Sequence, residues 1–437
     1  MKEKTFKQSI STLSLFIFFL MSACASVTSN SKTTILEHPR YGETIAETLA
    51  EEISIEAAPE PEKFIRGIHL SAWISGPNKH RAAVIDLFDN TELNTAVIDI
   101  KEMEGQIYID GVKTANNSGA YFKAIPNITE YLAKLKEKNI YTIARVVVFR
   151  DNLMPRKKPS MGVKKPDGTL WTDNKGITWL DPYNKDVWEY IFEMCERAID
   201  LGFEEIQFDY IRFPSDGNIK NCRYSNKEHS SETASQAIVE FLKEANKRLK
   251  AKDAKISIDV FGGTTTSSND MGIGQKIVEM AEWVDYVSPM VYPSHYYRGE
   301  FGLQEPNKEP YTVVYKAIEG ALKRIPKEKL RPWLQDFTMF GYKYEKKHIR
   351  AQIQACYDNE IGNWLLWNPR CVYTREALKE NEAEMLYVKS SPLTPEMIKA
   401  AEKLEVPEAK QEDNQTQIIE TTKEIEKEKT TELEQAQ

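Results

Sequence analysis

The sequence predicts an α/β protein of the (β/α)8 barrel class, also called the TIM barrel. Eight short runs rich in β-branched and aromatic residues recur along its central part. Several of these runs are almost continuously apolar, which is typical of parallel strands buried on both faces. Amphipathic helical patterns separate the runs, for example over 128–138, 185–201, 235–249 and 310–324. Strands and helices that alternate in this way favour a closed parallel barrel.

The eight runs are interpreted as strands in chain order. They cover residues 66–73, 96–101, 141–149, 205–213, 255–262, 284–292, 331–337 and 363–368. Asp181 followed by Pro182, shortly before the helical pattern over 185–201, predicts an N-cap with proline in the first turn. The runner-up fold is an open doubly wound sheet, but the glycine-rich turn that this fold places after its first strand is missing. Gly272 and Gly274 form only a lone G-x-G.

The N-terminus predicts an export signal rather than a part of the barrel. Three lysines precede about a dozen apolar residues, a run too short to span a membrane. The run ends in Met21-Ser22-Ala23-Cys24, which is similar to a bacterial lipobox, so lipidation of Cys24 is expected. The alternative is an ordinary cleaved signal with a chance cysteine near its end. A lipid anchor implies attachment to a membrane by acyl chains, on the periplasmic or outer side of a bacterial cell envelope.

The remaining organisation follows from composition. We expect a signal peptide at 1–23, a flexible tether rich in Ser, Thr, Glu, Ala and Pro at 24–62, the barrel at 63–385, and a charged tail at 386–437. The tail has almost no aromatic residues and cannot bury enough apolar area to order itself, so we expect disorder there. The four cysteines after Cys24 could form one or two disulfides or stay as buried thiols.

Composition also limits the class of partner. The formal net charge is −8, so a nucleic-acid-binding surface is not expected. Six histidines and five cysteines are spread over the chain without metal-ligand spacing, so neither a metal nor another cofactor is predicted. The sequence leaves the oligomeric state open.

Polar residues stand at the predicted C-terminal ends of the strands, where barrels carry their reactive groups. The carboxylates are Asp99, Asp209, Asp259 and Asp336, and the other candidates are Lys101, Arg145, Arg212, Tyr292, His295 and Asn368. Carboxylates inside apolar strands need a partner or a function, because burial of an unpaired charge is unfavourable. One interpretation is that ion pairs with the basic residues only hold the loops.

The second interpretation is glycoside hydrolysis. Asp209 and Asp259 end neighbouring strands, and alternation along each strand directs both toward the barrel mouth. One carboxyl group kept neutral and one kept ionised would supply the acid and the nucleophile or base. Arg212 has the opposite parity to Asp209, so the two can meet only if the strand bends or ends near Ile211.

Aromatic residues in and near the loops predict a sugar-binding groove, because the C–H faces of sugars pack on aromatic rings. Trp171 and Trp179 lie in a loop longer than a connection needs, which favours a substrate wall or lid. The predicted strands one, seven and eight carry Trp73, Trp333 and Trp367. The alternative for each of them is a place in the core.

Several strings in chain order resemble a known family. They are RGIHLSAW (66–73), LDPYN (180–184), EIQFDYIRFPSDG (205–217), DMGIGQ (270–275), SPMVYPSHY (288–296), RPWLQDF (331–337) and WLLWN (364–368). Together they resemble the glycosyl hydrolase-like domain family DUF4015 from about residue 64 to 378. The resemblance implies a barrel distantly similar to the α-amylase-like glycoside hydrolases.

By position in such barrels, the resemblance implies Asp209 as nucleophile, Asp259 as acid and Asp336 as a charge-stabilising residue. Strand five offers Asp where the amylase pattern has Glu, and the arginine follows Asp209 instead of preceding it. The leading hypothesis is therefore a lipid-anchored glycoside hydrolase acting on a polysaccharide or oligosaccharide. A catalytically silent glycan-binding module and a metal-dependent hydrolase are the alternatives.

Overall fold

The computed structural model of the protein describes residues 64–379. The predicted signal peptide, lipidated Cys24, tether and charged tail lie outside the described residues, as do both ends of the predicted domain 63–385. Within 64–379, no helix is long and apolar enough to cross a membrane.

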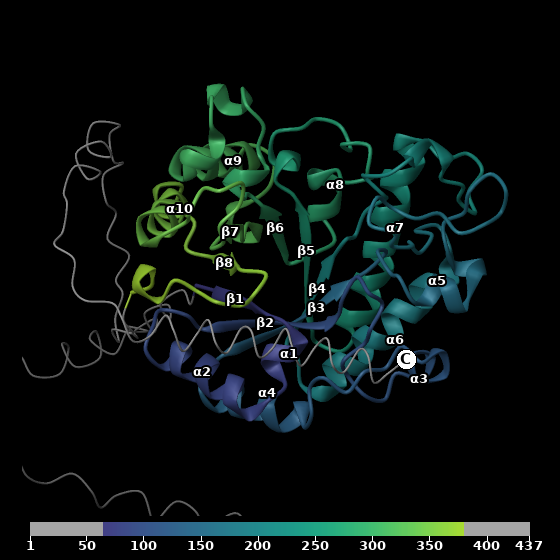
Figure 1. Ribbon diagram of the computed structural model, residues 1–437, viewed down its shortest axis with the longest axis horizontal. Coiled ribbons are helices and arrows are strands. Elements are labelled where there is room, and N and C mark those ends of the chain that lie inside the picture. Colours follow the sequence, from purple (N-terminus) through teal and green to yellow (C-terminus); the bar gives the residue numbers. More distant parts are fainter. Residues whose placement is uncertain (1–63, 380–437) are drawn as a thin grey trace, which may run out of the picture. The chain divides into compact units, whose positions relative to one another are not determined.

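Eight parallel strands form a closed barrel in chain order, which confirms the predicted fold class. The strands are β1 (Arg66–Leu70), β2 (Thr95–Lys101), β3 (Tyr141–Val147), β4 (Glu205–Asp209), β5 (Lys255–Phe261), β6 (Tyr286–Met290), β7 (Trp333–Gln335) and β8 (Trp364–Trp367). The barrel closes where β1 pairs with β8, with Gly67 opposite Leu365. In Figure 1 the strands occupy the middle of the molecule and the helices lie around them.

The longer helices cover the outside of the barrel, because each of them buries one apolar face. The helices are α1 (Ala72–Ser75), α2 (Asn78–Asp89), α3 (Lys113–Ser118), α4 (Ile128–Glu137), α5 (Met154–Lys157), α6 (Lys185–Leu201), α7 (Ser231–Lys250), α8 (Ile277–Ala281), α9 (Pro310–Leu322) and α10 (Lys346–Asp358). Along α6, for example, Val187, Ile191, Met194 and Ala198 are buried at helical spacing. The main apolar core lies between this helical layer and the sheet.

Two predicted boundaries are wrong for local reasons. The N-cap of α6 is Asn184, whose side chain accepts a hydrogen bond from the Asp186 N–H, and not Asp181. Asp181 instead accepts backbone hydrogen bonds from Tyr183 and Ser225 and so holds two loops together. β4 ends at Asp209, four residues before the predicted end at Phe213, because Tyr210 has a φ of 48°. Residues with positive φ cannot continue a strand.

The inside of the barrel is partly polar. Arg331 donates two hydrogen bonds to the Glu205 carboxylate, and both side chains are fully buried. Ser257 and Tyr141 also donate to Glu205, and the Arg331 guanidinium lies 4.4 Å from the centre of the Tyr286 ring. This pair was not predicted from the sequence, and it fills the interior of the barrel near the start of β4.

Candidate active site

A cavity of about 520 Å³ opens at the C-terminal ends of the strands, and we call it the central cavity. Eight of the predicted site residues line it: Arg145, Asp209, Arg212, Asp259, Tyr292, His295, Trp333 and Trp367. They come from six different strands or the loops that follow them. This is the place where (β/α)8 barrels carry their reactive groups.

Arg145 on β3 is the electrostatic centre of the cavity. Its guanidinium forms ion pairs with Asp209 and with Asp99, where Nη1 lies 2.5 Å from Oδ1. Its Nε lies 3.8 Å from Oδ2 of Asp259. The arginine is almost fully buried, and these carboxylates raise its pKa further although burial opposes this. One permanent cation therefore faces three carboxyl groups from β2, β4 and β5.

Asp99 takes its second partner from β1. Its Oδ2 lies 2.6 Å from Nε2 of His69, and the His69 ring stacks on Trp367 at 3.9 Å. Burial opposes ionisation of both groups, but their mutual attraction and Arg145 lower the pKa of Asp99 to about 2. Burial likewise lowers the pKa of His69, yet Asp99 outweighs it and raises that pKa to about 10. His69 and Asp99 are thus both charged at neutral pH, and Asp99 links His69 to Arg145.

The pKa of Asp259 on β5 is shifted in the opposite direction to that of Asp99. It is 1% exposed, and its Oδ1 accepts a hydrogen bond of 2.7 Å from Nε1 of Trp333. Burial raises its pKa well above the ordinary range of an aspartate, and the charge of Asp209 raises it further. Arg145 and Trp333 only partly offset these effects. Asp259 therefore keeps a proton where an ordinary carboxyl group has lost it.

Asp209 ends β4 against a strained turn. Its Oδ1 accepts a hydrogen bond of 2.6 Å from the N–H of Tyr210, the residue with positive φ. A bulky residue in this region of φ is unfavourable by about 1–3 kcal/mol and persists where the surroundings require it. Because β4 ends at this turn, the alternation of side chains along the strand does not continue to Arg212. Asp209 and Arg212 therefore both line the cavity. The predicted bend is present, one residue earlier than expected.

Arg212 is held by aromatic rings. Its guanidinium carbon lies 5.0, 4.7 and 4.6 Å from the ring centres of Trp179, Tyr210 and Phe261. Its hydrogen bonds with described residues both come from Nη1, to the carbonyl of Phe213 and the hydroxyl of Ser215. Burial lowers its pKa from the usual arginine value. Other N–H groups of this cation remain for a ligand in the cavity.

The loop tryptophans do not form the predicted groove. Trp171 and Trp179 are only 2% and 1% exposed, and their indole N–H groups point to Asn218 and Asp173. Trp73 packs edge-on against Phe122 at 5.5 Å. The hypothesis of a stacking wall at Trp171 and Trp179 is therefore wrong, because the long loop folds back and buries both rings. Trp179 still acts on the site indirectly through Arg212.

Four other predicted residues lie outside the lining of the central cavity: Asp99, whose contacts are given above, Lys101, Asp336 and Asn368. The Asp336 carboxylate accepts hydrogen bonds from the Thr374 N–H and hydroxyl at 2.8 and 2.7 Å, and its carbonyl accepts one from Asn368. Burial raises the pKa of Asp336 to about 6. Lys101 is fully buried, 3.0 Å from Asp151 Oδ2, and donates to the carbonyl of Val147. These contacts hold loops, so we give Asp336 no part in the chemistry.

Several lining residues were not predicted from the sequence. They are Met103, Tyr210, Phe261, Gly262, Gly263, Met271, Met290 and Glu300. Two of them are glycines directly after β5, which is the sequence feature that could have marked them, and the structure shows that a Cβ at Gly262 would lie 2.5 Å from both the Met290 carbonyl oxygen and the Tyr296 hydroxyl. The apolar residues among them are indistinguishable in sequence from core residues.

The four cysteines within the described residues form no disulfide bonds with one another. Cys195, Cys222, Cys356 and Cys371 are free thiols. Among residues 64–379, no group of three or more His, Cys, Asp or Glu side chains is arranged to hold a metal ion.

The model of one protein family matches residues 67–373, which is most of the chain. The chain belongs to the DUF4015 family. That family is described as a "putative glycosyl hydrolase domain". The match confirms the resemblance noted in the sequence and covers all eight strands except the first residue of β1.

Solved structures give three further comparisons. A hypothetical protein from Ruminiclostridium thermocellum is 35% identical over 44% of this chain and 97% of its own, with a TM-score of 0.40. The PgaB (BpsB) glycoside hydrolase domain from Bordetella bronchiseptica is 12% identical over 73% and 99%, with a TM-score of 0.55. The spore cortex-lytic enzyme SleL from Bacillus megaterium is 11% identical over 72% and 73%, with a TM-score of 0.45. The similarity to the PgaB domain shows a shared fold. None of the curated proteins compared with the chain matches it.

Proposed function

We propose that this DUF4015 protein hydrolyses O-glycosidic bonds of a polysaccharide, with Asp259 as the acid and Asp209 as the nucleophile. One observation carries the proposal. Two carboxyl groups at the mouth of the barrel contact Arg145, and burial raises the pKa of one of them, Asp259, well above the ordinary aspartate value. Glycoside hydrolysis requires one carboxyl group that donates a proton and a second one that acts as nucleophile or base.

The strand register supports a double displacement. Phe208 lies opposite Ile258, so the next residues along, Asp209 and Asp259, occupy matched positions on β4 and β5. Both carboxyl groups also contact the same Arg145 guanidinium. We infer from this a close pair of the kind found in retaining enzymes, whose carboxyl groups lie about 5–5.5 Å apart.

In the first step Asp209 attacks the anomeric carbon, while Asp259 gives its proton to the departing glycosidic oxygen. The bond to the leaving sugar breaks as the bond to Asp209 forms. In the second step Asp259, now a carboxylate, takes a proton from water as the water displaces Asp209 from the sugar. Arg145 compensates the charge that remains on the pair throughout, and Arg212 offers N–H donors to substrate hydroxyl groups.

A screen of polysaccharides tests the proposed function. We expect the purified protein to release oligosaccharides from at least one member of a panel that includes hexosamine polymers and α-glucans, as detected by mass spectrometry. The first product should keep the anomeric configuration of the substrate, as read by proton NMR before mutarotation. Binding of a glycan without release of products would instead support the silent binding module.

The pH dependence follows from Asp259. Its acid form is the active one, and its pKa is raised, so activity should persist below the raised pKa and fall as the pH increases through it. The coupled pair then sets the profile of kcat/KM, and the alkaline limb lies well above that of an exposed aspartate. Activity that keeps rising from neutral into alkaline solution would contradict Asp259 as the acid. Circular dichroism over the same pH range serves as the control for folding.

A further inference from the structure

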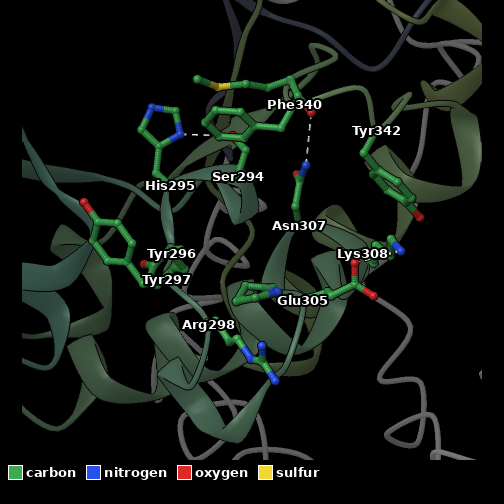
Figure 2. Close-up of a pocket in the computed structure, with 12 residues that line it drawn as sticks. Ser294, His295, Tyr296, Tyr297, Arg298, Glu305, Asn307, Lys308, Phe340 and Tyr342 are labelled. Carbon is green, nitrogen blue, oxygen red and sulfur yellow. Dashed lines mark hydrogen bonds and ion pairs between the residues drawn. The ribbon is translucent and has the colours of Figure 1, made fainter.

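A second cavity of about 520 Å³ lies beside the first, and we call it the outer cavity. The loop after β6 and the loop after β7 form it, and Figure 2 shows Phe340 and Tyr342 across from Tyr297 and Arg298. His295, Tyr296 and Tyr297 line both cavities. A chain that occupies the central cavity can therefore continue into the outer one past a shared wall.

Two large rings of the outer cavity are exposed to solvent. Tyr297 is 79% exposed and Phe340 is 78% exposed. Among residues 64–379, the other large apolar side chains in this exposed class are Ile219, Met271 and Val278, all less than 50% exposed. Exposed aromatic surface at a cavity indicates a binding role, because a bound apolar face would remove it from water.

The backbone at Phe340 supports the same interpretation. The Tyr342 N–H donates to the Met339 carbonyl at 3.1 Å, and the two residues between them both have positive φ, 54° at Phe340 and 74° at Gly341. A two-residue turn of this kind favours Asn, Asp or Gly at its first position. A bulky residue there is strained and marks a place where the side chain is needed.

Polar groups complete the outer cavity. Asn307 donates to the Met339 carbonyl at 3.2 Å, while its buried Oδ1 has no hydrogen-bond partner among the described residues. A dashed line at Asn307 marks this bond in Figure 2. Lys308 pairs with Glu305 at 2.8 Å, and Arg298 donates to Gln304. Donors and acceptors between two aromatic rings suit a pyranose, whose C–H face is apolar and whose rim carries hydroxyl groups.

We infer that the outer cavity is a sugar-binding site that holds further units of the same glycan whose bond is cleaved in the central cavity. This inference rests on the proposed function. It makes the substrate a polymer of several pyranose units rather than a small glycoside. The two rings contribute by packing on sugar faces, and the strained turn keeps Phe340 in place before the ligand arrives.

Binding without turnover tests the inference. The parent is Asp259→Asn, and its migration is measured in native gels that contain glycol chitin, soluble starch or the polymer hydrolysed in the screen. Phe340→Asn removes the ring but suits the turn, and it is combined with Tyr297→Ala. We expect the parent to be retarded by at least one polymer, and the combined variant to bind that polymer about five- to tenfold more weakly.

Val278→Ala in the same parent is the control, because Val278 is exposed on α8 and lines neither cavity. It should be retarded as strongly as the parent. Retardation unchanged by loss of both rings, or a parent that no gel retards, would overturn the inference. The proposed function fails differently, when the unmodified protein releases no product although the gels retard it.

Discussion

Asp259→Asn is expected to lower kcat/KM on the polysaccharide by about 10²- to 10⁴-fold, because removal of the general acid leaves the glycosidic oxygen to depart without a proton. The loss should shrink for an aryl glycoside whose leaving group needs no protonation. Circular dichroism should be unchanged, since asparagine still accepts the Trp333 N–H hydrogen bond. An equal loss on both kinds of substrate would contradict the role of Asp259 as acid.

Asp209→Asn separates the two roles. Loss of the nucleophile should abolish turnover of both substrates, whatever the leaving group, and added azide should restore formation of a glycosyl azide. Asp336→Asn makes the same chemical change in a buried aspartate that lines neither cavity. We expect this control to keep kcat/KM within a few-fold of the unmodified protein. Turnover retained by Asp209→Asn, or lost as completely by Asp336→Asn, would refute the assignment.

Arg331→Ala is expected to lower the free energy of unfolding by about 3–5 kcal/mol, because it leaves the Glu205 carboxylate buried without its cation. Urea denaturation monitored by tryptophan fluorescence measures the change. Lys134→Ala removes an exposed ion pair with Glu130 on α4 and should change stability by less than about 1 kcal/mol.

A double variant tests whether the loss of stability in Arg331→Ala comes from the unpaired charge of Glu205. Arg331→Met combined with Glu205→Gln removes both charges, and it should recover part of the loss that Arg331→Ala causes. A loss in Arg331→Ala no larger than that in Lys134→Ala would show that the buried pair does not contribute as proposed.

The order and number of strands could be predicted because they depend on local pattern. Runs such as Thr95–Lys101 are buried along their whole length, and α6 spans the predicted residues. The pair Asp209 and Asp259 could also be predicted, since position at a strand end and parity decide which side chains reach the barrel mouth. The exact end of β4 could not be predicted from the sequence, because the positive φ of Tyr210 depends on the residues packed around it.

The aromatic residues show where prediction from sequence stops. A tryptophan in a long loop has the same sequence signal whether it lines a groove or closes a core, and Trp171 and Trp179 do the latter. Phe340 was not predicted at all, because its exposure depends on a turn that local preference disfavours. Similarly, Glu205 and Arg331 are 126 residues apart, and only barrel closure brings them together.

The sequence by itself therefore determined the barrel and the two carboxyl groups at its mouth, because periodicity and strand order are local properties. The tertiary structure decided how they are placed, because it buries Asp259, which raises the pKa of that group, and sets Arg145 against carboxyl groups from three strands. It also excluded Asp336 from the lining of the central cavity and placed Tyr297 in the wall that the two cavities share. These features depend on contacts between distant segments, and no local pattern encodes them.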